Sequence, residues 1–185
     1  MVVGRVPPEA RSHRLADPPG TSIATIVLLM ARPPRVSGFD YRGQYRYFLT
    51  FGTFERRKYF QNPDVTAMVL WHLRRTARRE RFAILAYCLM PDHVHLLVEG
   101  TTLESDVRRF VKRTKQRSGQ VYSRTNEHRL WDEGYYDRVL RSDTDVREVA
   151  RYIVWNPVRA GLSSTPGEYP YLGSDLLSAE DLIRI

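Results

Sequence analysis

Residues 82–98 read FAILAYCLMPDHVHLLV, two apolar runs separated by a Pro-Asp pair. Apolar runs of this length, bounded by turn residues, are typical of buried strands. Proline followed by aspartate is typical of a tight turn, so Pro91-Asp92 is predicted to connect two antiparallel strands, 82–90 and 93–98. This hairpin is the centre from which the rest of the fold is predicted.

The segments that flank the hairpin continue an alternation of strands and helices. YRYFLTFGTF, which begins at Tyr45, alternates large apolar residues with smaller or polar ones, as a half-buried strand does. Asn62-Pro63-Asp64 supplies a helix cap with proline in the first turn. The sequence after the hairpin predicts three more elements: a helix from about Leu103 to Tyr122, an irregular strand within 129–141, and a helix from Ser142 or Asp143 that ends at Pro157.

The order of these elements predicts an α+β fold, a ferredoxin-like antiparallel sheet with the helices packed on one face. Residues 1–38 contain six prolines and no sustained hydrophobic period, so we expect a flexible Pro/Arg-rich arm there, with Met30 as an alternative start of the protein. The folded domain is expected at 39–174 and a C-terminal tail at 175–185. A chain of 185 residues is long enough for one domain with a hydrophobic core and short for two.

The charge of the chain is strongly positive and is carried almost entirely by arginine. The formal net charge is +8, and of 29 basic residues only Lys58, Lys112 and Lys115 are lysines. Guanidinium groups bind phosphate in a bidentate way and stack on bases, which favours a nucleic acid as partner. A GC-rich genome is the alternative explanation, because it replaces lysine codons by arginine codons without a change of function.

Cysteine usage and hydropathy indicate a cytoplasmic protein without a membrane span. The single cysteine, Cys88, excludes a disulfide framework and a multi-cysteine zinc site. The apolar stretch from Thr21 to Ala31 has about half of the roughly 20 residues that a spanning helix needs. We also find no GxxxxGK[ST] motif, so no nucleotide cofactor is expected.

Two histidines interrupt the second strand of the predicted hairpin. Side chains two apart on a strand share a face, so His93 and His95 lie opposite the apolar set Val94, Leu96 and Val98. Their backbone positions are roughly 7 Å apart, near enough for both imidazoles to bind one divalent ion. The alternative is that both histidines merely occupy a solvent-exposed sheet face.

ARYIVWNPVRAGL, residues 150–162, adds a tyrosine and an amide to the candidates. Tyr152 and Asn156 are four apart and therefore lie on one helix face, which Glu148 shares. A tyrosine beside a cation is a candidate nucleophile, because the positive charge favours the phenolate. The alternatives are that Tyr152 packs at the helix edge and that Asn156 ends the helix before proline.

PDHVHLLVE at 91–99, followed by YIVWNPVRAGL at 152–162, resembles the signature of the HUH single-tyrosine transposases, and specifically of the REP-associated tyrosine transposase branch. The resemblance spans roughly residues 39–174. It implies that His93 and His95 bind Mg²⁺ or Mn²⁺, that Tyr152 is the nucleophile and that Asn156 helps to hold the metal.

The resemblance also implies a substrate and a reaction. The family cleaves and rejoins single-stranded DNA at hairpin or palindromic repeats through a 5′-phosphotyrosine, which here implies a bacterial, nucleoid-associated transposase acting as a monomer or homodimer. Two alternatives remain: an HUH relaxase or replication-initiation nickase, or a domesticated DNA-binding protein that no longer cuts.

Basic helix faces offer a path for the DNA backbone. The candidate contacts on the two predicted helices before and after the hairpin are Arg74, Arg75, Arg78, Arg108, Arg109, Lys112 and Arg113. Tyr136 is a further candidate, either for stacking on a base or for packing in the protein. A solvated helix surface is the alternative for each basic residue.

Overall fold

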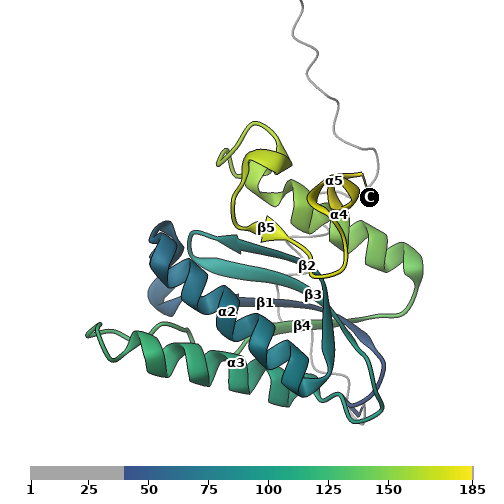
Figure 1. The fold of residues 1–185 in the computed structure, drawn as a ribbon, viewed down its shortest axis with the longest axis horizontal. Coiled ribbons are helices and arrows are strands. Elements are labelled where there is room, and N and C mark those ends of the chain that lie inside the picture. Colours follow the sequence, from purple (N-terminus) through teal and green to yellow (C-terminus); the bar gives the residue numbers. More distant parts are fainter. Residues whose placement is uncertain (1–39, 185) are drawn as a thin grey trace, which may run out of the picture. The chain divides into compact units, whose positions relative to one another are not determined.

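The computed structural model describes residues 40–184, which form one antiparallel sheet with helices on both of its faces (Figure 1). Its strands are β1 (Arg46–Gly52), β2 (Phe82–Met90), β3 (His93–Gly100), β4 (Tyr136–Leu140) and β5 (Leu172–Gly173), in the order β4-β1-β3-β2-β5. Its α-helices are α2 (Pro63–Glu80), α3 (Val107–Tyr122), α4 (Asp143–Arg159) and α5 (Ala179–Ile183). The predicted α+β class and antiparallel sheet are confirmed.

The predicted hairpin is present as β2 and β3, and it occupies the middle of the sheet. Leu89 pairs with Val94 and Met90 with His93 across the Pro-Asp turn. β1 lies on the other side of β3, in a register that pairs Thr50 with His95. The histidine pair is therefore carried by an interior strand with neighbours on both edges.

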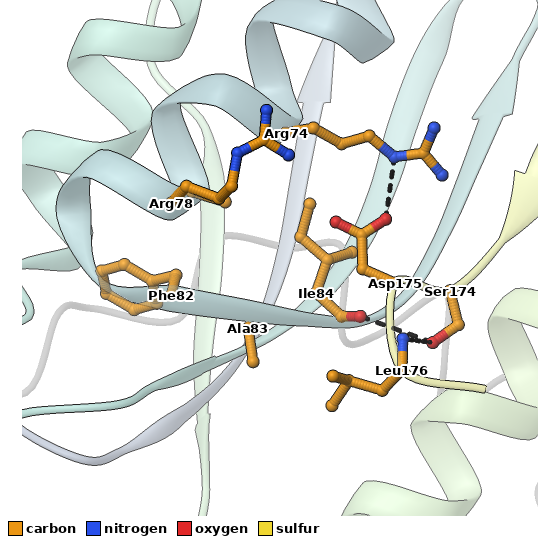
Figure 2. Close-up of a pocket in the computed structure, with 9 residues that line it drawn as sticks. Arg74, Arg78, Phe82, Ala83, Ile84, Ser174, Asp175 and Leu176 are labelled. Atoms are coloured by element: carbon orange, nitrogen blue, oxygen red, sulfur yellow. Dashed lines mark hydrogen bonds and ion pairs between the residues drawn. The ribbon is translucent and has the colours of Figure 1, made fainter.

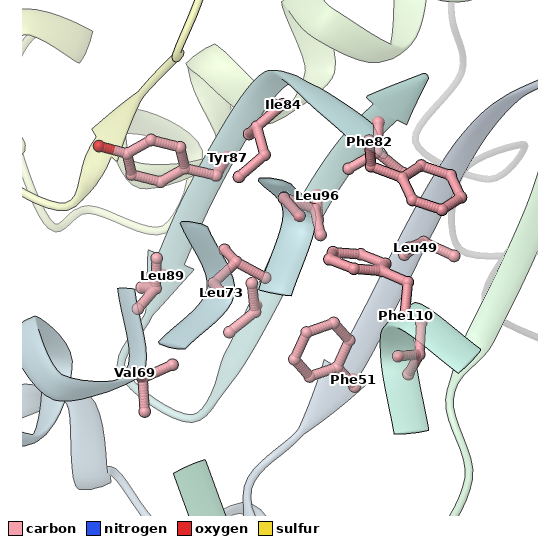
Figure 3. Close-up of a cluster of buried hydrophobic side chains, with 14 of the residues drawn as sticks. Leu49, Phe51, Val69, Leu73, Phe82, Ile84, Tyr87, Leu89, Leu96 and Phe110 are labelled. Carbon is pink, nitrogen blue, oxygen red and sulfur yellow. The ribbon is translucent and has the colours of Figure 1, made fainter. Parts of the chain in front are cut away.

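The first core layer lies between the sheet and the helices α2 and α3 (Figure 3). Leu49, Phe51 and Leu96 of the strands pack with Leu73 of α2 and Phe110 of α3. The strand residues occupy the alternating positions that the sequence predicts, and Leu73 and Phe110 lie on the faces of their helices that the sheet covers.

The starts of both helices follow from their caps. The side chain of Asn62 accepts a hydrogen bond from the backbone N–H of Asp64 at 2.9 Å, so α2 begins where the sequence predicts. α3 begins at Val107 and not at Leu103, because the side chain of Asp106 caps the helix by accepting from the backbone N–H of Arg109 at 2.9 Å.

The prediction that the helices pack on one face of the sheet is wrong for α4. Only α2 and α3 share a face, whereas α4 packs on the opposite one, where Val149 and Ile153 meet Phe48 and Leu97. Figure 1 shows α4 and α5 across the sheet from α2 and α3. The physical reason is that the strands are apolar on both faces, and a second apolar face must also be covered.

Two element limits also differ from the prediction. Pro157 does not end α4, which continues to Arg159, because a proline this close to the helix end removes a single backbone hydrogen bond and the last turn still closes, with Ala160 N–H donating to Asn156 O at 3.0 Å. The strand expected within 129–141 is confined to β4, because Gly134 (φ +71°) turns the chain before it.

The second core layer lies between the sheet and α4. The chain after residue 174 contributes to this layer through Leu182 of α5, which is buried. The domain limits predicted at 38 and 174 stay predictions. The expectations for the N-terminal arm, including Met30 and the apolar stretch 21–31, lie outside the described residues. Among residues 40–184, no helix combines the length and the apolarity that crossing a membrane requires.

Candidate active site

The candidate site lies where the end of the β2–β3 hairpin meets β1 and the helix α4. His93 and His95 come from β3, Thr50 from the neighbouring β1 and Tyr152 from α4. His95 has 1% of its surface exposed, because Phe48 and Tyr152 cover it with ring centroids 5.7 and 5.4 Å away. The alternative of two histidines on a solvent-exposed sheet face is therefore wrong: α4 covers that face.

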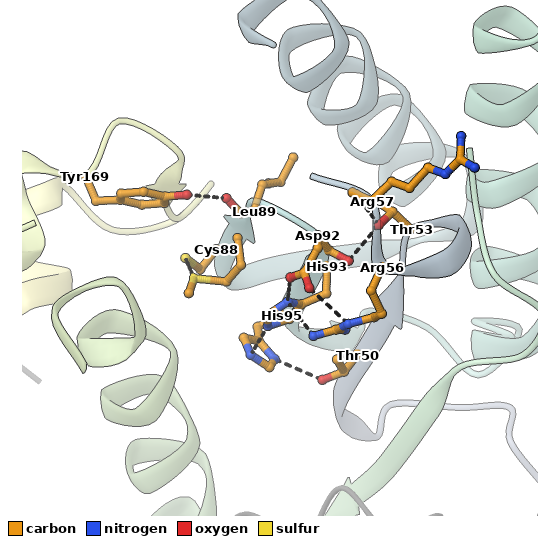
Figure 4. Close-up of polar contacts among 11 residues, drawn as sticks. Thr50, Thr53, Arg56, Arg57, Cys88, Leu89, Asp92, His93, His95 and Tyr169 are labelled. Carbon is orange, nitrogen blue, oxygen red and sulfur yellow. Dashed lines mark hydrogen bonds and ion pairs between the residues drawn. The ribbon is translucent and has the colours of Figure 1, made fainter. Parts of the chain in front are cut away.

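The two imidazoles point their Nε2 atoms at each other. These atoms are 3.0 Å apart, and the opposite nitrogen of each ring has its own partner (Figure 4). His93 Nδ1 lies 2.6 Å from a carboxylate oxygen of Asp92, and His95 Nδ1 lies 2.9 Å from the hydroxyl of Thr50. The carboxylate accepts a hydrogen bond from His93 Nδ1–H, and we assign the same role to the Thr50 oxygen toward His95 Nδ1–H; with these tautomers both Nε2 atoms carry lone pairs.

The surroundings keep both histidines neutral. Burial lowers the pKa of His95 well below its usual value, and the charges of His93, Arg159 and Arg56 lower it further. Burial also lowers the pKa of His93, and the hydrogen bond to Asp92 opposes this only in part. With the tautomers assigned above, the two Nε2 lone pairs face each other at 3.0 Å, an arrangement that a cation between them would stabilise.

Asn156 follows Tyr152 by one helical turn and is the sequence-predicted third ligand. Its Nδ2 atom is buried and has no hydrogen-bond partner among the described residues. The amide can be placed with oxygen and nitrogen exchanged, which would offer a buried oxygen at that position. No group of three or more His, Cys, Asp or Glu suited to a metal exists within residues 40–184, and Glu148 is exposed, so the third ligand stays a prediction.

Four residues at this site escaped the sequence-based prediction. Thr50 and Asp92 orient the imidazoles, while Arg56 and Arg159 bring positive charge beside them. Arg159 has a sequence signal, because its spacing of seven from Tyr152 places it on the same helix face. Thr50 has none, since its position opposite His95 depends on the register of two strands that are distant in the sequence.

The predicted DNA contacts on α2 lie on the other side of the sheet from Tyr152. Arg74 Nε is 2.8 Å from the carboxylate of Asp175, and Arg74 and Arg78 line a cavity of about 630 Å³ beside it (Figure 2). Arg75 stacks on the exposed ring of Trp71 at 4.9 Å. The structure therefore does not bring these arginines to the histidine pair.

The predicted contacts on α3 divide into two kinds. Arg109 and Arg113 both bind the carboxylate of Glu80, whose side chain is 1% exposed. Arg108 lies over the ring of Tyr41 at 4.2 Å, and Lys112 is exposed. Two of the four cations thus neutralise a buried acid that joins α2 to α3.

Of the two roles that the sequence leaves open for Tyr136, its surroundings favour packing. The ring is 9% exposed and meets the edge of Phe48 at 5.9 Å. Burial raises the pKa of its hydroxyl. A base could stack on this ring only after the core had opened.

Comparison with known proteins identifies relatives of the chain. Residues 42–156 match the family described as transposase IS200 like. A Haemophilus influenzae protein assigned as a REP-associated tyrosine transposase is 23% identical over 109 residues, a match that spans 53% of this chain and 62% of that protein. The solved structure of a REP-associated tyrosine transposase bound to a REP hairpin superposes with a TM-score of 0.65 at 19% identity, over 76% of this chain and 82% of that one. The two proteins share a fold.

Proposed function

This chain belongs to the IS200-like transposase family, and on that premise we propose that it cleaves and rejoins single-stranded DNA at hairpin or palindromic repeats. The observation that supports this most directly is the pair of Nε2 atoms 3.0 Å apart on His93 and His95, next to the ring of Tyr152. It combines a site for a cation with a nucleophile on a facing element. Such a substrate would place the protein with the bacterial nucleoid.

The residues present fit a divalent cation, Mg²⁺ or Mn²⁺. His93 and His95 would bind it through Nε2, with Asn156 as a third ligand, and both histidines are already held by partners on their other ring nitrogen. When bound, the cation would polarise a non-bridging phosphate oxygen and stabilise the negative charge that develops there.

Tyr152 performs the covalent step in this proposal. Its phenolic oxygen gives its proton to solvent and attacks the phosphorus of the scissile phosphodiester, and the bond from phosphorus to the 3′ oxygen breaks. The 3′ oxygen takes up a proton and leaves as a free hydroxyl, while the 5′ side stays joined to Tyr152 as a phosphodiester. A second DNA 3′-hydroxyl can reverse the reaction and join a new strand, because the bond energy is kept in the adduct.

A hairpin is the proposed DNA partner for two reasons. The relative with the same fold was solved with a REP hairpin bound, and this chain has cationic surfaces outside the catalytic site, such as Arg108 and Lys112. Phosphate contacts of this kind supply affinity without reading sequence. The DNA contacts predicted on α2 and α3 stay proposals.

The test is trapping of the covalent adduct. A pool of labelled single-stranded hairpin oligonucleotides with randomised flanks is incubated with the protein and Mn²⁺, and the products are separated on a denaturing gel. We expect an adduct with the wild type and with the control Tyr136→Phe, and none with Tyr152→Phe. Absence of an adduct with the wild type, or its persistence in Tyr152→Phe, would refute the proposal.

A further inference from the structure

We propose that Arg56 and Arg159 form a clamp that holds the scissile phosphate on the His93–His95–Tyr152 centre. The two arginines come from different parts of the fold and reach the centre from the hairpin side and from the α4 side. This inference rests on the proposed function and adds to it two residues that contact the substrate.

Arg56 lies against the histidine side of the centre. Its Nε atom is 3.0 Å from a carboxylate oxygen of Asp92, and its Nη2 atom is 3.4 Å from His93 Nδ1 (Figure 4). The side chain runs across the backbone of Gly52, where an added Cβ would lie 3.5 Å from Nη1. Nε is bound to Asp92, whereas His93 Nδ1 gives its hydrogen to the same carboxylate and accepts none from Nη2. Because half of the side chain is also exposed, the N–H groups of Nη1 and Nη2 can serve a ligand.

The backbone around Arg56 is held in an unfavourable conformation that aims this side chain. Glu55 and Arg56 have φ values of +53° and +55°, a backbone conformation that residues other than glycine rarely adopt. Hydrogen bonds attach the loop to the hairpin turn: Thr53 donates both its N–H and its hydroxyl to the carbonyl of Asp92, at 3.0 and 2.9 Å. A costly local conformation retained beside a chemical centre is the pattern expected of a functional loop.

Arg159 lies against the nucleophile. Its guanidinium carbon is 4.6 Å from the centre of the Tyr152 ring, and its Nη2 donates to the backbone carbonyl of Tyr152 at 2.5 Å. Tyr152, Asn156 and Arg159 follow one another at spacings of four and three, so they form one stripe along α4. Because α4 continues past Pro157, this stripe includes Arg159.

A phosphodiester between these two groups is the ligand whose chemistry fits. It carries one negative charge on two non-bridging oxygens, and that charge grows on the phosphoryl oxygens during attack by Tyr152. Guanidinium groups match two oxygens at once, and preorganised donors aimed at developing charge stabilise the transition state more than the ground state. The clamp therefore acts on the rate of cleavage more than on hairpin affinity.

The test measures single-turnover adduct formation with the hairpin oligonucleotide selected by the wild type in Mn²⁺. We expect Arg56→Ala and Arg159→Ala each to lower the rate about 10- to 100-fold, the effect of losing a hydrogen bond between charged groups. Arg57→Ala, in the same loop, and Arg147→Ala, exposed on the same helix, are the matched controls and should keep the rate. Thermal melting of every variant and hairpin binding in gel shifts are measured in parallel.

A second measurement separates contact with the phosphate from a merely structural role. Each stereoisomer of a methylphosphonate at the scissile position removes the negative charge and one non-bridging oxygen. If the clamp touches that phosphate, at least one isomer slows the wild type strongly and slows Arg56→Ala and Arg159→Ala by less, so the losses do not add. Full additivity with both isomers would overturn the clamp and assign these arginines to positioning.

The outcomes also separate this inference from the proposed function. No adduct with the wild-type protein would refute cleavage itself. An adduct with the wild type and rates for Arg56→Ala and Arg159→Ala within about twofold of their controls would leave cleavage intact and refute the clamp.

Discussion

Replacing Glu80 by glutamine should lower the free energy of unfolding by about 2 kcal/mol at pH 7. Glu80 is the buried end of an ion-pair cluster that joins α2 to α3, and its carboxylate accepts hydrogen bonds from Arg109 and Arg113. Glutamine keeps the shape but presents an NH₂ group to one of the guanidiniums. At least one charge-assisted hydrogen bond is therefore lost.

The magnitude follows from the burial of each partner. A hydrogen bond to a charged group contributes about 1.5–3 kcal/mol when its partner is buried. The Glu80 side chain is 1% exposed, but those of Arg109 and Arg113 are 43% and 47% exposed, so water screens part of the interaction. A loss of about 2 kcal/mol corresponds to a fall in Tm of about 4–8 °C for a domain of this size.

Urea unfolding followed by circular dichroism measures this difference, and its pH dependence tests the cause. Burial raises the pKa of Glu80, but Arg109 and Arg113 outweigh burial, and the net pKa lies below the usual value. A lowered pKa means that the carboxylate stabilises the folded state above the unfolded pKa of about 4.3, and that this contribution disappears as pH falls through the folded pKa. The difference between wild type and variant should stay constant from neutral pH to about pH 5.5 and shrink below about 4.3.

Glu104→Gln is the matched control. Glu104 pairs with Arg81, but their side chains are 68% and 55% exposed, so its replacement should leave the free energy of unfolding unchanged within error. Equal effects of Glu80→Gln and Glu104→Gln would refute the assignment of a buried ion cluster, as would an effect of Glu80→Gln that is the same at pH 3.5 and pH 7.

Three further predictions concern the metal, the C-terminal segment and DNA binding. Thr50→Val removes the hydroxyl that holds His95 Nδ1 and should weaken Mn²⁺ binding about 10- to 100-fold by calorimetry; the buried N–H left without an acceptor also lowers the melting temperature of the metal-free protein. Leu182→Ala empties part of the second core layer and should cost about 2–3 kcal/mol in urea unfolding; a change within error would mean that α5 does not stabilise the domain. Lys112→Ala should lower the dependence of hairpin affinity on salt by about one ion without slowing cleavage, and an unchanged salt slope would remove Lys112 from the DNA path.

Much of the fold could be predicted because its signals are local. Two apolar runs and one Pro-Asp turn predict the hairpin, and an asparagine cap followed by apolar residues at helical spacing predicts α2. Each element can therefore be predicted from a segment of about twenty residues. Features that depend on contacts between distant parts of the sequence were not predicted. Whether a strand is apolar on one face or on both depends on what packs above it, and for this reason α4 was expected on the same side as α2 and α3.

The candidate site shows the same division. Alternation along β3 is enough to separate His93 and His95 from the apolar set, and spacing along α4 is enough to align Tyr152 with Asn156. Their meeting depends on long-range contacts, because α4 must cross to the sheet face that carries the histidines. The partners that orient the imidazoles depend on the same contacts, since Thr50 reaches His95 only through the register of β1 against β3.

By itself, then, the sequence determined the strands β1 to β4, the helices α2 to α4 and the chemical types that carry the proposed reaction: two imidazoles, a phenol and an amide. Only the tertiary structure decided which face of the sheet becomes the site, that His95 is buried there, and that Arg56 and Arg159 flank it. The reason is physical: side-chain periodicity is a property of one strand or helix, whereas burial, register and the approach of charges are set by packing between elements that are distant along the chain.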